Sequence, residues 1–335
     1  MSTLVTRLPG LVFASALGLA GLGLALLPPF RHLQLSALTL AIVLGMLCGN
    51  LLGARLPNAF APGIVYAQRS LLRAGVVLYG LRISFQQIAA VGFDALLLDL
   101  AIVASTLALG VWIGRRWLGL DRDTALLTAC GSAICGAAAV LATERLLKPE
   151  PSKVAIAVAS VVLFGTLNIF LYPQLAIWLA IPADAFGIYA GATVHEVAQV
   201  VAIGNAVSPA ATDTAVIVKL TRVLMLVPFL FILGGWQARK GGTRGAVSMP
   251  WFALAFVGVC ALNSLVSLPA LLRDRLLDLD TLLLASAMAA LGLETRFSRL
   301  RTLGPKPLLL AFVLFVWLSV GGYWLTRWLA WPISA

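Results

Sequence analysis

Long apolar runs alternate with short polar connectors along the whole chain. Cutting the sequence at proline, glycine and charge clusters gives eleven apolar segments, and a bilayer core about 30 Å thick needs roughly 20 such residues per helix. We expect membrane-spanning helices near residues 9–28, 35–55, 62–83, 93–117, 124–147, 153–180, 183–206, 212–237, 250–268, 279–298 and 306–330. The longest polar connector, residues 237–250, is too short for a soluble domain.

Composition agrees with this pattern. Of the 335 residues, 61% are hydrophobic and 11% are charged, whereas soluble domains are about 25% charged. The sequence therefore predicts an all-α polytopic membrane protein that forms a single integral membrane domain over residues 1–335. The first apolar run is longer than the core of a signal peptide and many spans follow it, so we interpret it as a retained helix.

The net charge of +11 does not indicate a nucleic-acid partner. Basic residues stand in ones, twos and threes between apolar segments, and no basic stripe forms. These residues are better explained by orientation in the bilayer. With eleven spans, the positive-inside rule favours a cytoplasmic N-terminus and a C-terminus on the opposite, periplasmic side.

Two segments of the chain resemble each other. DTALLTACGSAICG from Asp123 echoes DTLLLASAMAALG from Asp280 at an offset of 157 residues, and the odd number of helices between them makes the copies inverted. The repeats would cover about 35–180 and 183–332, with 9–28 as an extra helix. A competing match pairs Tyr79 with Leu291 at an offset of 212 and is also inverted, while shared Ala/Leu/Gly composition is the alternative explanation.

The segment GSAICG, Gly131 to Gly136, lies in the middle of a predicted span. Two glycines around a serine make an unwound break plausible where the segment is enclosed by protein. Such a break exposes backbone N–H groups at the positive end of the next half-helix, where an anion can bind. Gly131, Ser132, Cys135 and Gly136 are therefore candidate substrate-binding residues, unless they only form a small-residue packing surface.

Two basic residues, Lys219 and Arg222, lie inside the span predicted over residues 212–237. Their three-residue spacing places both on one helix face. A Lys or Arg at the centre of a span costs about 2.5–3.5 kcal/mol on insertion scales, so we expect both to point into the bundle or to snorkel to an interface. In the bundle they would bind an anionic substrate.

The stretch GATVHEVAQVVAIG contains His195, Glu196 and Gln199 in otherwise apolar surroundings. In one regular helix over residues 183–206, His195 and Gln199 would share a face and Glu196 would be rotated by about 100°. A histidine and a buried glutamate can both exchange protons near neutral pH, so these residues are candidates for proton coupling. Alternatively, Glu196 neutralises Lys219 or Arg222.

The remaining polar positions carry less information. Asp94 and Asp99 fall near the start of a predicted span and are interpreted as ordinary surface charges. The four cysteines lack metal-ligand or disulfide spacing and are expected to be buried small hydrophobes. Motifs of hydrolases, metalloproteases and nucleotide-binding proteins are absent, so we expect no enzyme activity, no cofactor and no metal site.

Together, GSAICGAAAV (Gly131–Val140) and GATVHEVAQVVAIG (Gly191–Gly204) resemble the two signature segments of the YeiH-type sulfate exporter family, and the likeness includes AMAALGLETRF (Ala287–Phe297). The resemblance implies a bacterial inner-membrane transporter, related to the cation/proton antiporter and bile acid transporter superfamily. It also implies two inverted five-helix repeats with discontinuous, crossing helices. The family pattern covers Gly131, Ser132, Cys135, Gly136, His195, Glu196 and Gln199, and it assigns no role to Lys219 or Arg222.

The function expected is secondary active transport of a small anion, namely sulfate, sulfite or another sulfur oxyanion, with protons or sodium as the coupling ion. One alternative is a cation/proton antiporter in which Glu196 carries the ion. A second is a membrane sensor that binds an anion without moving it. The sequence leaves open whether two copies form a homodimer.

Overall fold

The computed structural model describes residues 6–27, 36–52, 56–239, 250–266, 268–295 and 304–330. Within these ranges every regular element is a helix, and six helical stretches are long and apolar enough to cross a membrane. They are Leu8–Ala25, Val91–Arg116, Pro151–Trp178, Pro209–Gln237, Ala270–Glu294 and Pro305–Leu329. This agrees with the predicted all-helical, polytopic membrane class, whereas eleven spans and an inverted repeat stay predictions.

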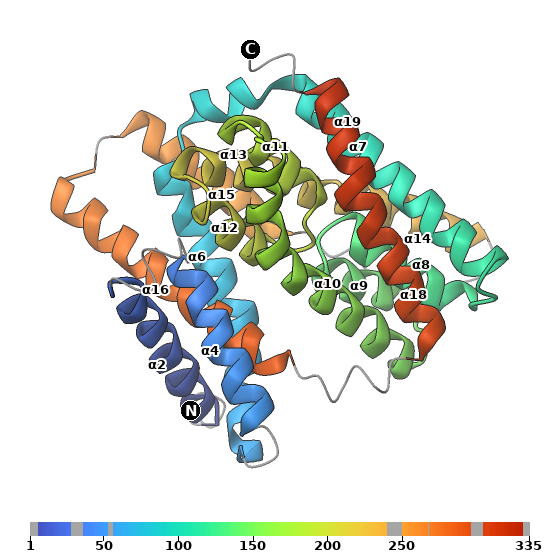
Figure 1. Cartoon of the computed structure of the whole chain (residues 1–335), viewed down its shortest axis with the longest axis horizontal. Coiled ribbons are helices and arrows are strands. Elements are labelled where there is room, and N and C mark those ends of the chain that lie inside the picture. The colour runs from blue at the N-terminus through green and yellow to red at the C-terminus, as the bar shows by residue number, and fades with distance from the viewer. Residues whose placement is uncertain are drawn as a thin grey trace. The chain divides into compact units, whose positions relative to one another are not determined.

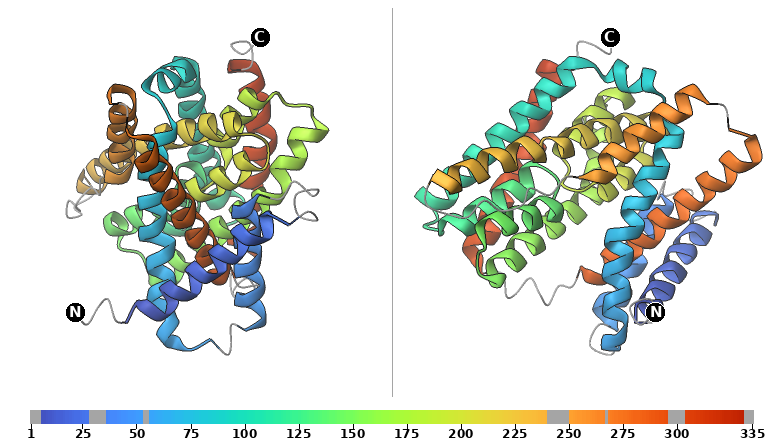
Figure 2. Two further views of the ribbon diagram at one scale, coloured as in Figure 1. Left: turned by 90° about the vertical axis from the view of Figure 1, so that its left-hand side faces the viewer. Right: turned by 180° about the vertical axis from the view of Figure 1, so that it is seen from behind.

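The chain divides into two compact units, and the first comprises residues 1–89 and 252–300. Its main helices are α2 (Leu8–Ala25), α4 (Ala37–Leu51), α5 (Ala61–Tyr66), α6 (Leu72–Tyr79), α15 (Trp251–Leu265) and α16 (Ala270–Glu294). Figures 1 and 2 show α2, α4 and α16 side by side. Gly45 and Gly292 allow close approach of α4 and α16, because a Cβ at either position would overlap backbone of the facing helix.

A buried ion pair links α16 to η3 (Gly80–Arg82) within the first unit. Nη2 of Arg82 lies 2.9 Å from Oδ2 of Asp280, and the same guanidinium donates to the hydroxyl of Thr281. The side chain of Asp280 is fully buried and that of Arg82 is 33% exposed. A carboxylate in this apolar setting depends on its cation, because solvent cannot replace it.

The second unit, residues 90–251 and 301–335, contains the segments singled out in the sequence. Its helices are α7 (Phe85–Arg116), α8 (Arg122–Ala133), α9 (Ala137–Leu147), α10 (Pro151–Trp178), α11 (Ala183–Thr193), α12 (Val197–Asn205), α13 (Pro209–Leu224), α14 (Leu226–Arg239), α18 (Pro305–Val316) and α19 (Gly322–Leu329). The segment from Asp123 is interrupted after α8, but its proposed repeat from Asp280 lies in the uninterrupted α16.

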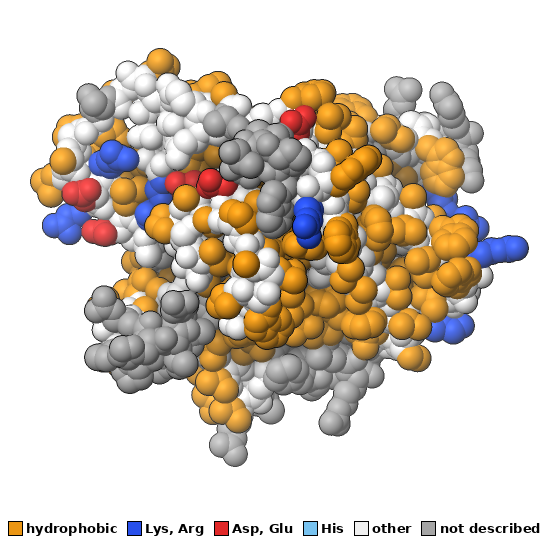
Figure 3. Space-filling model, turned by 45° about the horizontal axis from the view of Figure 1, so that its top comes forward, with side chains coloured by type: hydrophobic (Ala, Val, Ile, Leu, Met, Phe, Trp, Pro, Cys, Tyr) orange, Lys and Arg blue, Asp and Glu red, His pale blue; other side chains and the backbone are white. Residues whose placement is uncertain are grey.

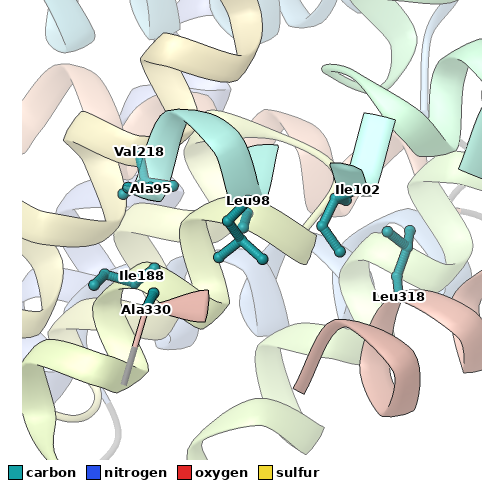
Figure 4. Close-up of a cluster of buried hydrophobic side chains, with 8 residues drawn as sticks. Ala95, Leu98, Ile102, Ile188, Val218, Leu318 and Ala330 are labelled. Atoms are coloured by element: carbon teal, nitrogen blue, oxygen red, sulfur yellow. The ribbon is translucent and has the colours of Figure 1, made fainter. Parts of the chain in front are cut away.

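An apolar cluster fixes α7 against α11 and α13 (Figure 4). Leu98 and Ile102 of α7 pack with Ala192 of α11, Val218 of α13 and Leu318. All five side chains are nearly or fully buried. The cluster therefore holds the middle of α7 beside the α13 segment that carries Lys219 and Arg222.

Large apolar side chains also cover the outside of the protein. Phe231, Ile232 and Trp328 are more than half exposed, and hydrophobic side chains dominate the face drawn in Figure 3, where charged ones form small groups. Exposed apolar surface on this scale is unfavourable in water and suits contact with lipid.

Asp121 begins α8 and yields a first prediction. Its carboxylate accepts hydrogen bonds from the backbone N–H groups of Asp123 and Thr124 and pairs with Lys153 at 3.1 Å. Burial raises the pKa of Asp121, but hydrogen bonds from Thr124 and Lys153 outweigh it, so the net pKa lies below the ordinary value. Asp121 therefore stabilises the fold above its unfolded pKa, and this stabilisation is lost as the pH falls through the lowered folded value.

Replacing Asp121 by Ala removes the cap and should cost about 1 kcal/mol at neutral pH. Thermal unfolding in detergent should show a lower midpoint for Asp121→Ala than for wild type, and the difference should shrink in strong acid. Asp123→Asn, which removes a neighbouring charge without a cap, is the control. Equal midpoints of the two variants at neutral pH would contradict the capping role.

Arg82→Ala should destabilise the protein by about 3 kcal/mol, because it leaves the carboxylate of Asp280 buried without its cation. The exposed Arg275 on α16 provides a matched control, and Arg275→Ala should leave the unfolding midpoint close to that of wild type. A midpoint for Arg82→Ala equal to that of the control would show that Asp280 does not need this partner.

Candidate functional site

The predicted break in GSAICG is present and occupies its second half. Helix α8 ends at Ala133, Ile134 has φ −112° and ψ −83°, and α9 begins at Ala137. Gly136 has φ +69°, a conformation that side chains other than glycine rarely adopt. Gly131 and Ser132 belong to α8, so the unwound segment runs from Ile134 to Gly136.

A second interruption separates α11 from α12, and the prediction of one regular helix over residues 183–206 is wrong here. Helix α11 ends at Thr193, and both Val194 and Glu196 have extended backbone conformations. Glu196 is the N-cap of α12 and forms a reciprocal capping box with Gln199. His195 and Glu196 therefore lie in the break, and the helical face expected for His195 and Gln199 does not exist.

Lys219 and Arg222 of α13 donate hydrogen bonds to backbone carbonyl oxygens at the C-terminal ends of α8 and α11, directly before the two breaks. The ammonium of Lys219 donates to the carbonyl oxygens of Ile134 and Val194, each at 2.7 Å. Both basic side chains are fully buried, so neither snorkels to an interface.

Arg222 makes the larger set of contacts. Its guanidinium donates to carbonyl oxygens on both interrupted helices, namely those of Ser132, Ala133, Ala192 and Val194. The last carbonyls of a helix have no partner within the helix and carry its negative end. The two cations therefore join and neutralise the C-terminal ends of α8 and α11.

Glu196 provides the opposite charge at the helix ends that follow the breaks. Its Oε1 accepts a hydrogen bond of 3.2 Å from the backbone N–H of Ala137, the first residue of α9. The same side chain caps the first turn of α12 through the N–H of Gln199. The chain's own carboxylate thus occupies the positive N-terminal ends at which an anion site was predicted.

Several buried polar side chains near the breaks keep atoms without a hydrogen-bond partner among the described residues. They are Ser132 Oγ, Asn168 Oδ1 and Gln199 Nε2. Asn168 lies in α10, and its amide nitrogen is 3.4 Å from Nδ1 of His195. Gly165, also in α10, packs against the side-chain amide of Gln199 from α12. Buried polar groups usually have partners, so these three atoms are exceptions among the described residues.

Asp99 is not the ordinary surface charge that the sequence predicts. It is fully buried in α7, and its charge interacts with those of Arg222 and Lys219. The apolar span of α7 begins at Val91, beside the non-helical residue Gly92 and close to the predicted start. The burial of Asp99 therefore comes from the face of the helix on which it lies, which is turned into the protein. Asp94 is exposed, as expected.

The structure therefore gathers most of the predicted residues in one place. The two breaks are flanked or contacted by Ser132, Lys219, Arg222 and Glu196. Cys135 lies in the first break and interacts electrostatically with Lys219. Among the described residues, no group of three His, Cys, Asp or Glu side chains could hold a metal ion. The arrangement brings two cations and one carboxylate to the inner ends of two interrupted helices.

The close contact between Gly136 and Glu196 gives a prediction. A Cβ at position 136 would overlap the side chain of Glu196, and the positive φ adds backbone strain. Gly136→Ala should lower the thermal unfolding midpoint, because Glu196 must leave the end of α9. Gly258→Ala, at a helical position with no neighbour within 4 Å, should keep or raise it. Equal behaviour of the two variants would show that the breaks tolerate displacement of Glu196.

Comparison with known proteins identifies the family. The family described as Conserved hypothetical protein 698 matches residues 9–311. The UPF0324 membrane protein PA5383 of Pseudomonas aeruginosa is 52% identical over 332 residues, which cover 96% of this chain and 94% of that protein. The UPF0324 inner membrane protein YeiH of Salmonella typhimurium is 47% identical and covers 94% and 92% of the two chains. The chain belongs to the UPF0324 family of membrane proteins that includes YeiH.

Proposed function

We propose that this protein is a secondary active transporter of a small anion, a sulfur oxyanion such as sulfate, sulfite or thiosulfate, in the bacterial inner membrane. The observation that carries the proposal is the pair of interrupted helices whose four inner ends contact charged side chains of the same chain. The proposal involves no enzymatic step and no cofactor. It keeps the cytoplasmic N-terminus and periplasmic C-terminus that the distribution of basic residues favours.

Energetics support a transport role for the breaks. Irregular backbone within a membrane is tolerated only where protein or water satisfies it, and buried ionisable residues there are costly. A protein that needed only a stable bundle would be better served by two continuous helices. Discontinuous helices whose ends bind ions and anionic groups are a recurring feature of secondary transporters.

The charge balance supports an anion as the substrate. Four side chains determine it: the two buried cations Lys219 and Arg222, the buried acid Asp99 and the partly buried acid Glu196. These charges cancel when both acids are ionised. Protonation of either acid leaves a net positive charge, which attracts an anion and provides a reason for proton coupling.

Direct contacts to the anion would come from donors that have no hydrogen-bond partner among the described residues. Ser132 Oγ and Gln199 Nε2 are such groups, and both flank the breaks. Lys219 and Arg222 already donate to carbonyl oxygens, so in this conformation they act on the anion through their charge. Cation exchange through Glu196 is less favoured, because its carboxylate already accepts backbone N–H groups that a cation would have to displace.

Purified protein in proteoliposomes should exchange labelled sulfate, sulfite or thiosulfate across the membrane, and an inward proton gradient should drive accumulation of at least one of them. Ser132→Ala should reduce the affinity for the anion, because it removes a donor from the site. Ser264→Ala, which changes a serine of α15, is the control and should behave like wild type.

Other outcomes distinguish the alternatives. A sodium-driven change of internal pH without anion flux would support cation/proton exchange. Stabilisation of the purified protein by an anion, measured as a shift of the unfolding midpoint, without any flux would support a sensor. Either result would overturn the proposed anion transport.

A further inference from the structure

Asp99 combines two properties that no other described acidic residue of the second unit shares. Its side chain is 0% exposed, and neither Oδ1 nor Oδ2 has a hydrogen-bond partner among the described residues. Buried carboxylates are normally paired or hydrogen-bonded. The position of Asp99 therefore calls for a reason other than the stability of the fold.

Glu196 provides the contrast within the same unit. Its carboxylate accepts hydrogen bonds from backbone N–H groups at the starts of α9 and α12. These donors belong to helix ends that would lose their partner if the side chain moved away. Glu196 therefore has a structural role at the breaks, whereas the sequence makes it, with His195 and Gln199, a candidate for proton coupling.

The surroundings of Asp99 are well defined by packing. The apolar cluster that contains its neighbour Leu98 places α11, α13 and α19 against α7. The titratable groups on these helices are Asp184 and Tyr189 on α11, Asp213, Lys219 and Arg222 on α13, and Tyr323 and Arg327 on α19. Of these, Arg222 and Lys219 are the ones whose charges act on Asp99.

We propose that Asp99 is the proton-binding residue of the transport site, and that its protonation converts the electrically balanced pair of interrupted helices into an anion-attracting site. The step is the binding of one proton to the Asp99 carboxylate, which becomes a neutral carboxylic acid. Lys219 and Arg222 keep their carbonyl partners, so the helix ends stay satisfied in both states. The coupling of this step to anion movement rests on the proposed function.

The first experiment tests protonation without any anion. Infrared difference spectra of the purified protein are recorded between weakly alkaline and weakly acidic buffer, above the range in which exposed carboxylates titrate, about pH 4. Wild type should show the carbonyl stretch of a newly protonated carboxylic acid, and Asp99→Asn should lack it.

Two further variants serve as controls in the same spectra. Asp94→Asn, an exposed position on the same helix, should keep the band, and Glu196→Gln should also keep it. No band in wild type, an unchanged band in Asp99→Asn, or loss of the band in Glu196→Gln alone would overturn the assignment of the proton to Asp99.

The second experiment tests coupling in proteoliposomes with labelled thiosulfate and sulfate, which do not titrate over this pH range. Asp99→Asn should retain anion exchange, while accumulation driven by a proton gradient falls to the level of protein-free liposomes. Asp94→Asn should retain both activities, and equal unfolding midpoints would show that the variants are folded.

The outcomes separate the two proposals. Wild type that moves neither anion refutes the proposed function, and the infrared spectra then still decide whether Asp99 binds a proton. Wild-type transport together with undiminished accumulation by Asp99→Asn refutes the coupling role. Loss of exchange as well as accumulation in a folded Asp99→Asn variant also refutes it, because the residue would then belong to the path of the anion.

Discussion

Every interruption of a helix in apolar surroundings creates free N–H and C=O groups that must find partners, and the second unit is organised around this constraint. Lys219 and Arg222 donate hydrogen bonds to five carbonyl oxygens at the C-terminal ends of α8 and α11. Glu196 accepts hydrogen bonds from backbone N–H groups at the starts of α9 and α12. Leaving a buried polar group unsatisfied costs about 1–3 kcal/mol, so these three side chains together determine whether the breaks can exist.

Two of the side chains that satisfy the ends of the interrupted helices also act, through their charge, on the residue proposed to bind a proton. The helix ends are satisfied by side chains of the chain itself, and in the proposed mechanism the electric field around them depends on the ionisation of one further residue, Asp99. The apolar cluster of α7, α11 and α13 holds Asp99 where the charges of Arg222 and Lys219 act on it, yet its carboxylate has no hydrogen-bond partner among the described residues. A group of this kind can change its charge without unfolding the site.

Sequence patterns predicted the membrane class, the break in GSAICG and the polar residues that line it, because glycine and charge stand out against apolar runs. The family resemblance implies discontinuous helices, but the residues did not locate the second break, because GATVHEVAQVVAIG lacks a glycine at the interruption and Glu196 is a less common N-cap than Ser or Asp. The burial of Asp99 was missed because the sequence does not show which face of α7 packs against α11 and α13, and the neighbouring Asp94 is exposed. The carbonyl contacts of Lys219 and Arg222 join residues more than 20 positions apart, which no local pattern reveals.

The most direct test of this account is the thermal unfolding of Arg222→Met in detergent, compared with wild type and with Thr221→Val on the same helix. Replacing a buried ionic group by an apolar one of similar size is often neutral or stabilising when its partners are removed with it. Here the carbonyl oxygens remain, so we predict a large fall in the midpoint for Arg222→Met and a small change for Thr221→Val. An unchanged or raised midpoint for Arg222→Met would contradict the claim that this cation holds the two interrupted helices together.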